Sequence, residues 1–460
     1  MSSSRAFKVA FKCSACGKCC TGKGGKVRVN TREVEAIADH LSIPTKELRR
    51  HYLRRHRDDD FDSLKQTPDD RQCIFLDGKQ CSIYPVRPTQ CQTYPFWPQQ
   101  LISKYDWTLA SKECEGILLD PSSDDDIIPD DRILKETVIH EVHRSGENIT
   151  YNEINELVAE LDPDMLHAFD QEVASKYRRK IVYEDQHVVV LDSFFDKLPP
   201  TRSLHFTDRL QLVQSEVFLT HEGAVDHSYL SLDVHRGLSV ALGFLDDSRR
   251  SSQWRIAMLG AGASVLPTFW HHLITRHRPV HIQVVEPRED MLRAGREYFD
   301  AADALQVHQQ FGESFVSESL MAGALMDLIV VDVEDGTSHA VSDDRGDGLL
   351  RAPPASMTSF SFLQDIRQLL TPRGVFAVNA IDGDKPIGER APRGSSVHCL
   401  SRRMAAVFDQ VWMLELAANV IVFGVKGDST SSAGPSGWSD ENDALQEILD
   451  EFRPNLRRVQ

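Results

Sequence analysis

The sequence predicts an α/β fold for its larger C-terminal part and a small Cys-rich α+β domain near its N-terminus. Three observations lead to this prediction. The chain has 460 residues, which at roughly 100 to 200 residues per domain is too long for a single core. Eight of its nine cysteines precede residue 115. Beyond about residue 250, apolar strand-like runs alternate with helical segments, which is the pattern of a mostly parallel sheet covered by helices.

The composition excludes several classes of protein. Hydrophobic residues make up 41% of the chain and charged residues 26%, as in ordinary soluble proteins. No apolar run approaches the roughly 20 residues that a membrane span needs. The 52 basic residues against 69 acidic ones give a net charge of −17, which disfavours broad binding to nucleic acid or anionic membranes. We therefore expect neither a membrane nor a nucleic acid as a partner.

The first ten residues lack the apolar stretch and the small-residue cleavage site of a secretory signal. We therefore expect a cytoplasmic protein whose thiols stay reduced. Clustered cysteines in such a protein indicate metal ligands rather than disulfides. The oligomeric state is left open, with a homodimer as one option.

The N-terminal elements are expected from capping and spacing signals. Asn30-Thr-Arg-Glu33 is a capping box that precedes apolar residues in helical spacing, and a second short helix should cover residues 46–56. The acidic, proline-bearing stretch 121–131 is typical of a domain boundary. Residues 133–178 should form a helical connector with a break at 144–148.

The pattern changes to that of strands at Ile181, where a β-hairpin region should precede the main sheet. Further strand candidates are residues 255–259, 281–285, 328–331, 375–378, 410–416 and 419–425, with helices at 288–299 and 360–370. The polar tail after Lys426 should be disordered and end in a short amphipathic helix. The predicted domains are residues 11–117, a linker and connector at 118–180, 181–426, and a tail at 427–460.

The cysteines have a spacing that suits metal binding. Cys13-x-x-Cys16-x-x-Cys19-Cys20 places four thiols within eight residues, and such short spacers let sulfur atoms converge without closing long loops. Four more follow at Cys73, Cys81, Cys91 and Cys114. The aromatic residues Tyr84, Tyr94, Phe96 and Trp97 among them are expected to form the small domain's core, with a role of Arg87 and Tyr94 beside the metal or a substrate as the alternative.

This constellation, with Cys81-Ser-Ile-Tyr-Pro-Val-Arg-Pro and Tyr94-Pro-Phe-Trp97, resembles the CxxCxxCC zinc- or iron-chelating domain family, which includes flagellin lysine N-methylase. The resemblance covers residues 11–117. It implies a metal held by Cys13, Cys16, Cys19, Cys20, Cys73, Cys81, Cys91 and Cys114. Zinc and an iron–sulfur cluster both remain open, because thiolates suit either. Eight thiols exceed one tetrahedral site, so either two centres exist or some thiols are structural.

A glycine turn marks a second site. The apolar strand 255–259 runs into Gly260-Ala-Gly262, and Glu286 ends the next strand about 25 residues later. A carboxylate at that place can accept both hydrogen bonds from a ribose diol. The third glycine of the dinucleotide motif is absent, which fits adenosine without a pyrophosphate and therefore predicts S-adenosylmethionine as the cofactor.

Two acids follow a later buried strand. Asp332 and Asp335 lie where ligands bind in open α/β sheets, at the carboxyl edge. Acids there can hold the ammonium form of an amine and steer its proton away, so both are candidate catalytic residues. Asp335 is equally consistent with a solvated loop acid. His227 and His235 are candidates for orienting a substrate, or are ordinary surface or core histidines.

Residues 181–426 resemble the spermidine synthase-like class I methyltransferases, most of all the C-terminal domain of the dual elongation factor 1-alpha lysine and N-terminal methyltransferases. The segments Val225-Asp-His-Ser-Tyr-Leu230, Leu259-Gly-Ala-Gly-Ala-Ser264 and Asp332-Val-Glu-Asp335 carry the resemblance. It implies a Rossmann-like sheet and methylation of a protein amine, with elongation factor 1-alpha as the suggested partner. The implied cofactor contacts are Gly260, Gly262, Glu286, Gly312, Glu313 and Asp332. Phe311-Gly312 stands where that family often has Asp-Gly, which makes Glu313 the nearest substitute for the acid.

Two other functions remain open from the sequence. An aminopropyltransferase would use decarboxylated S-adenosylmethionine, but Asp332-Val-Glu-Asp335 replaces the Asp-Ser-Ser-Asp of spermidine synthases, and Gly336 follows instead of proline. These departures disfavour polyamine synthesis. The third function is that of a metal-dependent binding or redox adaptor with an inactive transferase domain.

Overall fold

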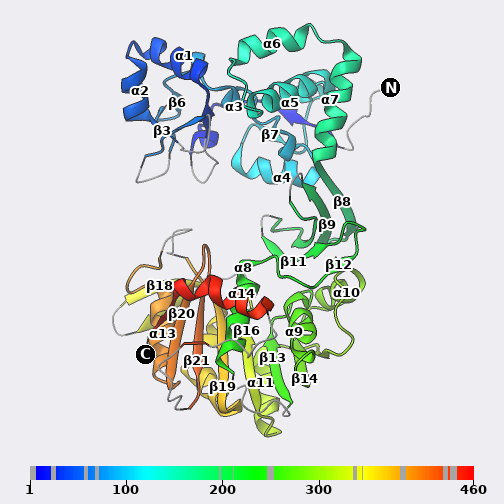
Figure 1. The fold of residues 1–460 in the computed structure, drawn as a ribbon, viewed down its shortest axis with the longest axis vertical. Helices are drawn as coiled ribbons and strands as arrows, with labels where there is room; N and C mark the ends of the chain where they lie inside the picture. Colours follow the sequence, from blue (N-terminus) through cyan, green and yellow to red (C-terminus); the bar gives the residue numbers. More distant parts are fainter. Residues whose placement is uncertain are drawn as a thin grey trace. The chain divides into compact units, whose positions relative to one another are not determined.

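The computed structural model divides into two compact units. Unit 1 comprises Met1–Lys180 and Ser193–Leu198, and unit 2 comprises Ile181–Asp192 and Pro199–Gln460. Figure 1 traces the chain through both. The residues that the structure describes are 7–21, 27–55, 61–67, 72–195, 198–210, 212–245, 253–334, 339–343, 346–383, 390–427, 434–435 and 443–459.

The Cys-rich part of unit 1 is built from very short elements. Its strands pair antiparallel as β1 (Ala10–Phe11) with β7 (Ile117–Leu118), β4 (Asp62–Leu64) with β2 (Arg28–Val29) and β3 (Leu53–Arg55), and β5 (Leu76–Asp77) with β6 (Gln80–Cys81). The helical turns of this part are η1 (Lys18–Cys20), η2 (Tyr84–Val86), α3 (Thr89–Gln92), η3 (Pro98–Gln100), α4 (Lys104–Glu113) and η4 (Asp124–Asp126).

The capping box predicted at Asn30 is confirmed at the start of α1 (Thr31–Leu41). The Asn30 side chain accepts from the Glu33 backbone N–H, and the Glu33 carboxylate accepts from the Asn30 N–H. The second helix, α2 (Thr45–Tyr52), is shorter than predicted. It stops because Leu53 turns extended and begins β3, which pairs with β4.

The segment expected to be a helical connector folds as α5 (Asp130–Arg144), α6 (Tyr151–Ala159) and α7 (Pro163–Lys176). The predicted break after residue 144 is confirmed. A second break was missed at Asp162, where Pro163 opens α7 and the Asp162 side chain caps it. The helices share a small core around Val138, Ile139 and Ile154, and they belong to unit 1.

An antiparallel sheet precedes the main sheet, where the sequence predicted a β-hairpin region. Its strand order is β12-β11-β10-β9-β8. These strands are β8 (Tyr177–Glu184), β9 (Val188–Phe195), β10 (Thr201–Phe206), β11 (Val213–Leu219) and β12 (Val225–Asp226).

The main sheet of unit 2 confirms the predicted α/β class. Its order is β15-β14-β13-β16-β19-β21-β20-β22, in which the first five strands run parallel and the last three join antiparallel. The strands are β13 (Trp254–Leu259), β14 (Val280–Val285), β15 (Gln306–His308), β16 (Met326–Val331), β19 (Leu370–Asp382), β20 (Gln410–Glu415), β21 (Val420–Val425) and β22 (Leu456–Arg458). A side hairpin, β17 (His339–Asp343) and β18 (Gly346–Ala352), pairs with the end of β19.

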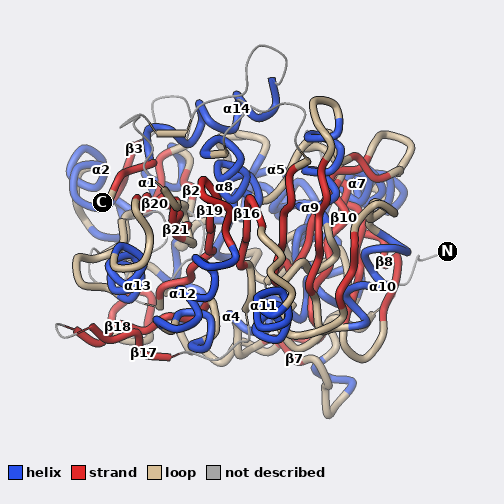
Figure 2. Tube along the Cα trace, turned by 90° about the horizontal axis from the view of Figure 1, so that it is seen from below, coloured by secondary structure: helices blue, strands red, loops and turns tan. Residues whose placement is uncertain are grey.

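Helices cover both faces of this sheet (Figure 2). The helices are α8 (Asp233–Ser239), η5 (Val240–Phe244), α9 (Val265–Thr275), α10 (Glu289–Tyr298), α11 (Gly312–Met321), η6 (Ala355–Thr358), α12 (Phe360–Leu369), α13 (Ser396–Ala405), α14 (Asp443–Phe452) and η7 (Arg453–Asn455). Alternate residues of each central strand enter opposite cores: Ile256 and Met258 of β13 face the cluster with α9 and α14, whereas Ala257 and Leu259 face α11, α12 and α13. Such two-sided burial explains the continuous apolar runs seen in the sequence.

The C-terminal tail is more ordered than predicted where the structure describes it. The amphipathic helix is confirmed as α14, but β22 was not predicted, because Leu456-Arg-Arg carries no hydrophobic alternation. Most of the stretch expected to be disordered, residues 428–433 and 436–442, lies outside the described residues.

Candidate functional site

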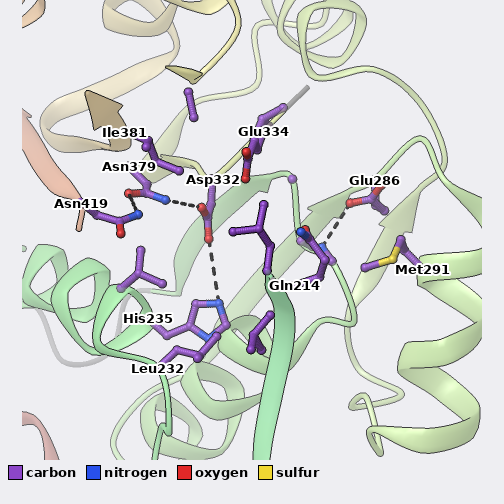
Figure 3. Close-up of a pocket in the computed structure, with 18 of the residues that line it drawn as sticks. Gln214, Leu232, His235, Glu286, Met291, Asp332, Glu334, Asn379, Ile381 and Asn419 are labelled. Atoms are coloured by element: carbon purple, nitrogen blue, oxygen red, sulfur yellow. Dashed lines mark hydrogen bonds and ion pairs between the residues drawn. The ribbon is translucent and has the colours of Figure 1, made fainter. Parts of the chain in front are cut away.

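A cavity of about 980 Å³ opens in unit 2 at the carboxyl ends of the parallel strands. Its lining comes from the β10–β11 connection, the start of α8, the turn after β13, the ends of β14, β16 and β19, and the β20–β21 turn. This is the edge at which open α/β sheets bind ligands. Figure 3 shows that polar side chains from these separate elements point toward one another.

The turn after β13 needs its two glycines. Gly260 has φ of 79°, and a Cβ there would lie 2.3 Å from the Asp332 carbonyl oxygen. Gly262 has φ of 53°, and its Cβ would lie 2.9 Å from Ser215 Oγ. Any side chain would therefore collide with neighbours while also straining the backbone. The turn exposes backbone to the cavity at the place where a bound molecule can approach it.

Glu286 follows β14 and borders the same turn. Its Oε2 accepts from the Gly262 N–H at 3.1 Å, and its Oε1 accepts from the Arg288 N–H at 3.1 Å. Burial raises the pKa of Glu286, and these two backbone hydrogen bonds act against that rise. Each carboxylate oxygen keeps a lone pair for a further donor. Glu286 is thus fixed in one orientation with acceptor capacity left over.

Asp332 follows β16 and is oriented by two amides. Asn379 Nδ2 donates to Asp332 Oδ1 at 2.8 Å, and Asn419 Nδ2 donates to Asn379 Oδ1 at 2.9 Å. The other oxygen, Oδ2, lies 3.9 Å from His235 Nε2. Burial raises the pKa of Asp332 to about 6, although the Asn379 hydrogen bond lowers it. The carboxylate therefore directs its other oxygen toward the imidazole (Figure 3).

His235, on α8, faces that oxygen from the other side of the cavity. It is 6% exposed, and burial lowers its pKa to about 4, so the imidazole is neutral at physiological pH. Within the part of the chain that the structure describes, its Nδ1 has no hydrogen-bond partner. A small polar group placed between this neutral imidazole and the Asp332 carboxylate could form hydrogen bonds to both.

The structure brings the predicted cofactor residues together. Gly260, Gly262, Glu286, Gly312, Glu313 and Asp332 all line the cavity. Glu313 is held by the Ser356 hydroxyl, which donates to its Oε1 at 2.5 Å. Asp335, the second predicted catalytic acid, lies outside the described residues.

Sequence reasoning missed Asn379 and Asn419. Asn379 carried the same signal as Glu286, because it is a polar residue that ends a buried run, Val375-Phe-Ala-Val. Asn419 stands in a tight turn between two apolar strands and carried no such signal. His235 was named only as an open choice, and the geometry now places it in the cavity wall.

The N-terminal cysteines are all unpaired and lie in unit 1. Cys19 and Cys20 sulfurs lie 3.9 Å apart, and this contact, followed by burial, raises the pKa of Cys19. Burial, followed by repulsion from the other thiols, also raises the pKa of Cys91. The electrostatic partners of Cys91 include Cys73, Cys81 and Cys19, so thiols from distant parts of the sequence influence one another.

These thiols fit a metal in kind, because soft sulfur donors suit zinc and iron–sulfur clusters. Burial raises the pKa of Cys73, Cys81 and Cys114 as well, which is a cost that binding a cation would offset. Among the described residues, however, no three His, Cys, Asp or Glu side chains are arranged to hold an ion together. The thiol donors are thus present, but within the described residues they do not form a closed coordination shell.

The strand order of the main sheet, the glycine turn after β13 and the acids after β14 and β16 define a Rossmann-like α/β fold whose cavity lies at the carboxyl ends of its parallel strands. The sequence model of the CxxCxxCC family, described as "Putative zinc- or iron-chelating domain", matches residues 12–115. The chain therefore carries both modules that the sequence predicted. No described helix is long and apolar enough to cross a membrane.

Among curated proteins, the chain is similar to the eEF1A lysine and N-terminal methyltransferase of Homo sapiens, with 31% identity over 170 residues, 35% of this chain and 22% of that protein. It is 24% identical over 203 residues to the Drosophila melanogaster homolog, covering 41% and 28% of the two chains. The matched part thus spans 22% to 28% of these relatives' length.

Two solved structures are also similar. A probable spermidine synthase from Corynebacterium glutamicum has a TM-score of 0.43 and 18% identity, covering 60% of this chain and 88% of that one. Human Methyltransferase-like protein 13 in complex with SAH has a TM-score of 0.37 and 22% identity, covering 47% and 100%.

Proposed function

We propose that unit 2 is an S-adenosylmethionine-dependent methyltransferase that acts on a protein amine. The observation that carries the proposal is the placement of two fixed carboxylates, Glu286 and Asp332, on either side of the glycine turn in one cavity of about 980 Å³. Glu286 faces the turn that a donor would approach, and Asp332 faces the region left for an acceptor. The similarity to a lysine and N-terminal methyltransferase supports the same assignment.

The donor half of the cavity uses residues that are already oriented. Glu286 keeps lone pairs for the two ribose hydroxyls, while Gly260 and Gly262 let backbone come close to the methionine part. Gly312 and Glu313 line the wall assigned to the adenine. When bound, S-adenosylmethionine supplies an electrophilic methyl group on a sulfonium.

The acceptor half is built to hold an amine. The Asn419 and Asn379 amides fix Asp332 so that its Oδ2 is free to accept from an ammonium, and the neutral His235 supplies a second acceptor at Nε2. Asp332 would accept the proton of the bound ammonium, so that the amine becomes neutral and able to take up the methyl group that S-adenosylmethionine would supply. Holding the amine in one orientation beside the donor half would contribute roughly 7 to 11 kcal/mol through positioning alone.

The acceptor protein in this proposal is elongation factor 1-alpha, the substrate that the names of the relatives state for those proteins. The acidic residues Asp332, Glu334 and Asp233 in the lining favour a cationic group over an anionic one. A lysine ammonium and an N-terminal ammonium both satisfy this chemistry.

We further propose that the N-terminal thiols bind zinc or an iron–sulfur cluster, in a reducing compartment such as the cytosol. The thiols are free, influence one another's pKa and are partly buried, which supports binding of a cation. Elemental analysis with an absorption spectrum decides the metal. Visible charge-transfer bands identify an iron–sulfur cluster, and a colourless protein with stoichiometric zinc identifies a zinc site.

The methyltransferase is tested first by titration calorimetry with S-adenosylmethionine on the metal-replete protein. No heat of binding from a folded sample excludes the enzyme and leaves the adaptor. Transfer of a tritiated methyl group to purified elongation factor 1-alpha tests the acceptor. Robust spermidine formation from putrescine and decarboxylated S-adenosylmethionine establishes the aminopropyltransferase instead.

The assignment of Asp332 is tested with Asp332→Asn. The variant keeps the shape and the Asn379 contact but cannot hold an ammonium or accept its proton. We expect turnover to fall by roughly 100-fold or more while the affinity for S-adenosylmethionine stays within twofold. Unchanged turnover removes Asp332 from the reaction.

A further inference from the structure

The last described segment of the chain, residues 443–459, packs on the acceptor side of unit 2. We call it the C-terminal brace. It consists of α14, η7 and β22. Leu445, Leu449 and Phe452 of α14 are at most 5% exposed and belong to the core that contains β13 and α9. A Cβ on Gly243 of η5 would lie 2.9 Å from Leu449, so helix and turn are in close contact.

The brace holds the α8 wall of the cavity. Asp233, Val234 and His235 line the cavity, and the next residue, Arg236, forms an ion pair with Glu451 of α14. The Arg236 guanidinium also lies over the Phe452 ring, 5.6 Å from its centroid. Glu451 and Phe452 of α14 thus both contact Arg236, the residue that directly follows His235.

The brace also holds a second wall, which adjoins α8 because a Cβ on Gly237 would lie 3.2 Å from Leu416. Residues 416–419, the β20–β21 turn, line the cavity, and Glu415 immediately precedes them. Arg457 of β22 donates to Glu415 Oε1 at 2.5 Å, while Leu456 pairs with Leu414 of β20 and the Val459 N–H donates to the Val411 carbonyl at 2.8 Å. These contacts fix the strand from which the turn that carries Asn419 projects.

The two walls meet at the reacting groups. His235 belongs to the first wall, and Asn419 on the second holds Asn379, which holds Asp332. The 3.9 Å separation between His235 Nε2 and Asp332 Oδ2 therefore depends on both walls. The donor half is fixed by other contacts, since Gly260 N–H donates to Val285 and Ala263 N–H donates to Ser215.

We propose that the C-terminal brace positions the acceptor site, with Glu451 and Arg457 as positioning residues that set the gap between His235 and Asp332. The inference rests on the proposed function insofar as that gap receives the acceptor amine. It assigns to the tail a role in acceptor binding and turnover, and none in donor binding.

The test is a charge reversal across the first ion pair. Glu451→Arg and Arg236→Glu should each raise the KM for elongation factor 1-alpha or lower kcat by about fivefold, the size expected for losing one ion pair and gaining a repulsion. The dissociation constant for S-adenosylmethionine should stay within twofold. The double variant, Arg236→Glu with Glu451→Arg, restores the attraction and should recover most of the loss. Glu447→Arg, one helical turn before Glu451, makes the same charge change at an exposed residue that has no ion pair within the described part of the chain, and it is the matched control.

Hydrogen exchange separates failure of the inference from failure of the proposed function, because it needs no turnover. In Glu451→Arg and in Arg457→Ala, the amides of α8 and of residues 416–419 should exchange faster than in Glu447→Arg, while those of residues 260–264 stay unchanged. Equal exchange in all variants overturns the brace, whether or not methylation is observed. A parallel loss of donor affinity, or a double variant that recovers nothing, also overturns it.

Discussion

The two units of this protein hold themselves together by different means. Before residue 120, every strand is two or three residues long, and the apolar side chains form separate small clusters such as that around Val29, Val34 and Ile37. Unit 2 instead buries whole strands between two helical layers, with β19 alone running for 13 residues. Unit 2 therefore has a large apolar core on each face of its sheet, whereas the described part of unit 1 before residue 120 has smaller, separate clusters, which we expect polar contacts and bound metal to connect.

A buried polar network supplies one such cross-link in unit 1. The Glu33 carboxylate is 4% exposed and accepts from the Thr89 N–H and hydroxyl, each at 2.7 Å, and from His143 Nε2 at 3.0 Å. These partners come from α3 and α5. One side chain therefore ties three elements together, including the turn that contains Cys91.

Removing the metal should produce the largest difference in stability between the two units. If thiolate–metal bonds close unit 1, stripping the metal with a chelator should unfold unit 1 and leave unit 2 folded, because a structural metal contributes its binding free energy to folding. Hydrogen exchange resolved by residue measures both units in one sample. Cys19→Ala should lose metal and protection in unit 1, and Cys399→Ala, on α13 of unit 2, is the control. Full protection of unit 1 after chelation would contradict the cross-link.

The glycine turn after β13 leaves no room for a side chain at Gly260. Gly260→Ala places a methyl group 2.3 Å from the Asp332 carbonyl oxygen. We expect the affinity for S-adenosylmethionine to fall by roughly 30-fold or more, measured by calorimetry. Gly223→Ala is the matched control, since Gly223 also has positive φ, 85°, but nothing lies within 4 Å of its Cβ position. An equal loss in both variants would mean that backbone strain, and not the collision, is responsible.

The polar cross-link of unit 1 should be weaker than a metal but measurable. Glu33→Gln replaces an acceptor of several hydrogen bonds and should destabilise unit 1 by about 2 to 3 kcal/mol in denaturant unfolding. Burial raises the pKa of Glu33, but His143 and Thr89 more than offset it, so the net pKa is lowered. The stabilisation is therefore complete above the unfolded pKa of 4.5 and is lost as pH falls through the folded value. Glu35→Gln, exposed on the same helix, should change neither stability nor its pH dependence.

The smallest expected effect concerns the stability cost of burying Asp332 in the candidate site of unit 2. The pKa of Asp332 in the folded state, about 6, exceeds its ordinary value of 3.8. Protonated Asp332 therefore contributes fully to the stability of unit 2 below pH 3.8, and this contribution is lost as the pH rises through 6. At pH 7 the buried charge costs about 1 to 2 kcal/mol after allowing for the 19% exposure of its side chain. Asp332→Asn should therefore raise the stability of unit 2 at pH 7 and leave it unchanged at pH 3.5. Wild-type methylation should fall as pH drops through about 6.

The sequence predicted unit 2 better than unit 1 for a physical reason. Buried parallel strands leave long apolar runs, and each polar residue that ends such a run points to the cavity, as Glu286 and Asp332 did. The same logic would have found Asn379. Short strands such as β5 and β6 leave no periodic signal, so in unit 1 the sequence predicted the capping box at Asn30, the helices and the cysteine spacing but none of the short strands.

Contacts between residues far apart in the sequence could not be predicted in either unit. Nothing in the local sequence pairs Glu33 with His143, which lies 110 residues away, or Glu415 with Arg457. The order of β22 beside β20 likewise depends on a backbone edge that only the folded sheet presents. Such features depend on tertiary structure, which explains why β22 was not predicted.

The order of strands in the main sheet also separates two kinds of change. The cavity residues Glu286 and Gly262 follow β14 and β13, whereas Asn379 and Asn419 come from β19 and the turn beyond β20. Substitutions can therefore accumulate on one side of Asp332 without disturbing the other. In a fold divided in this way, the acceptor specificity can change while the binding of the donor stays the same.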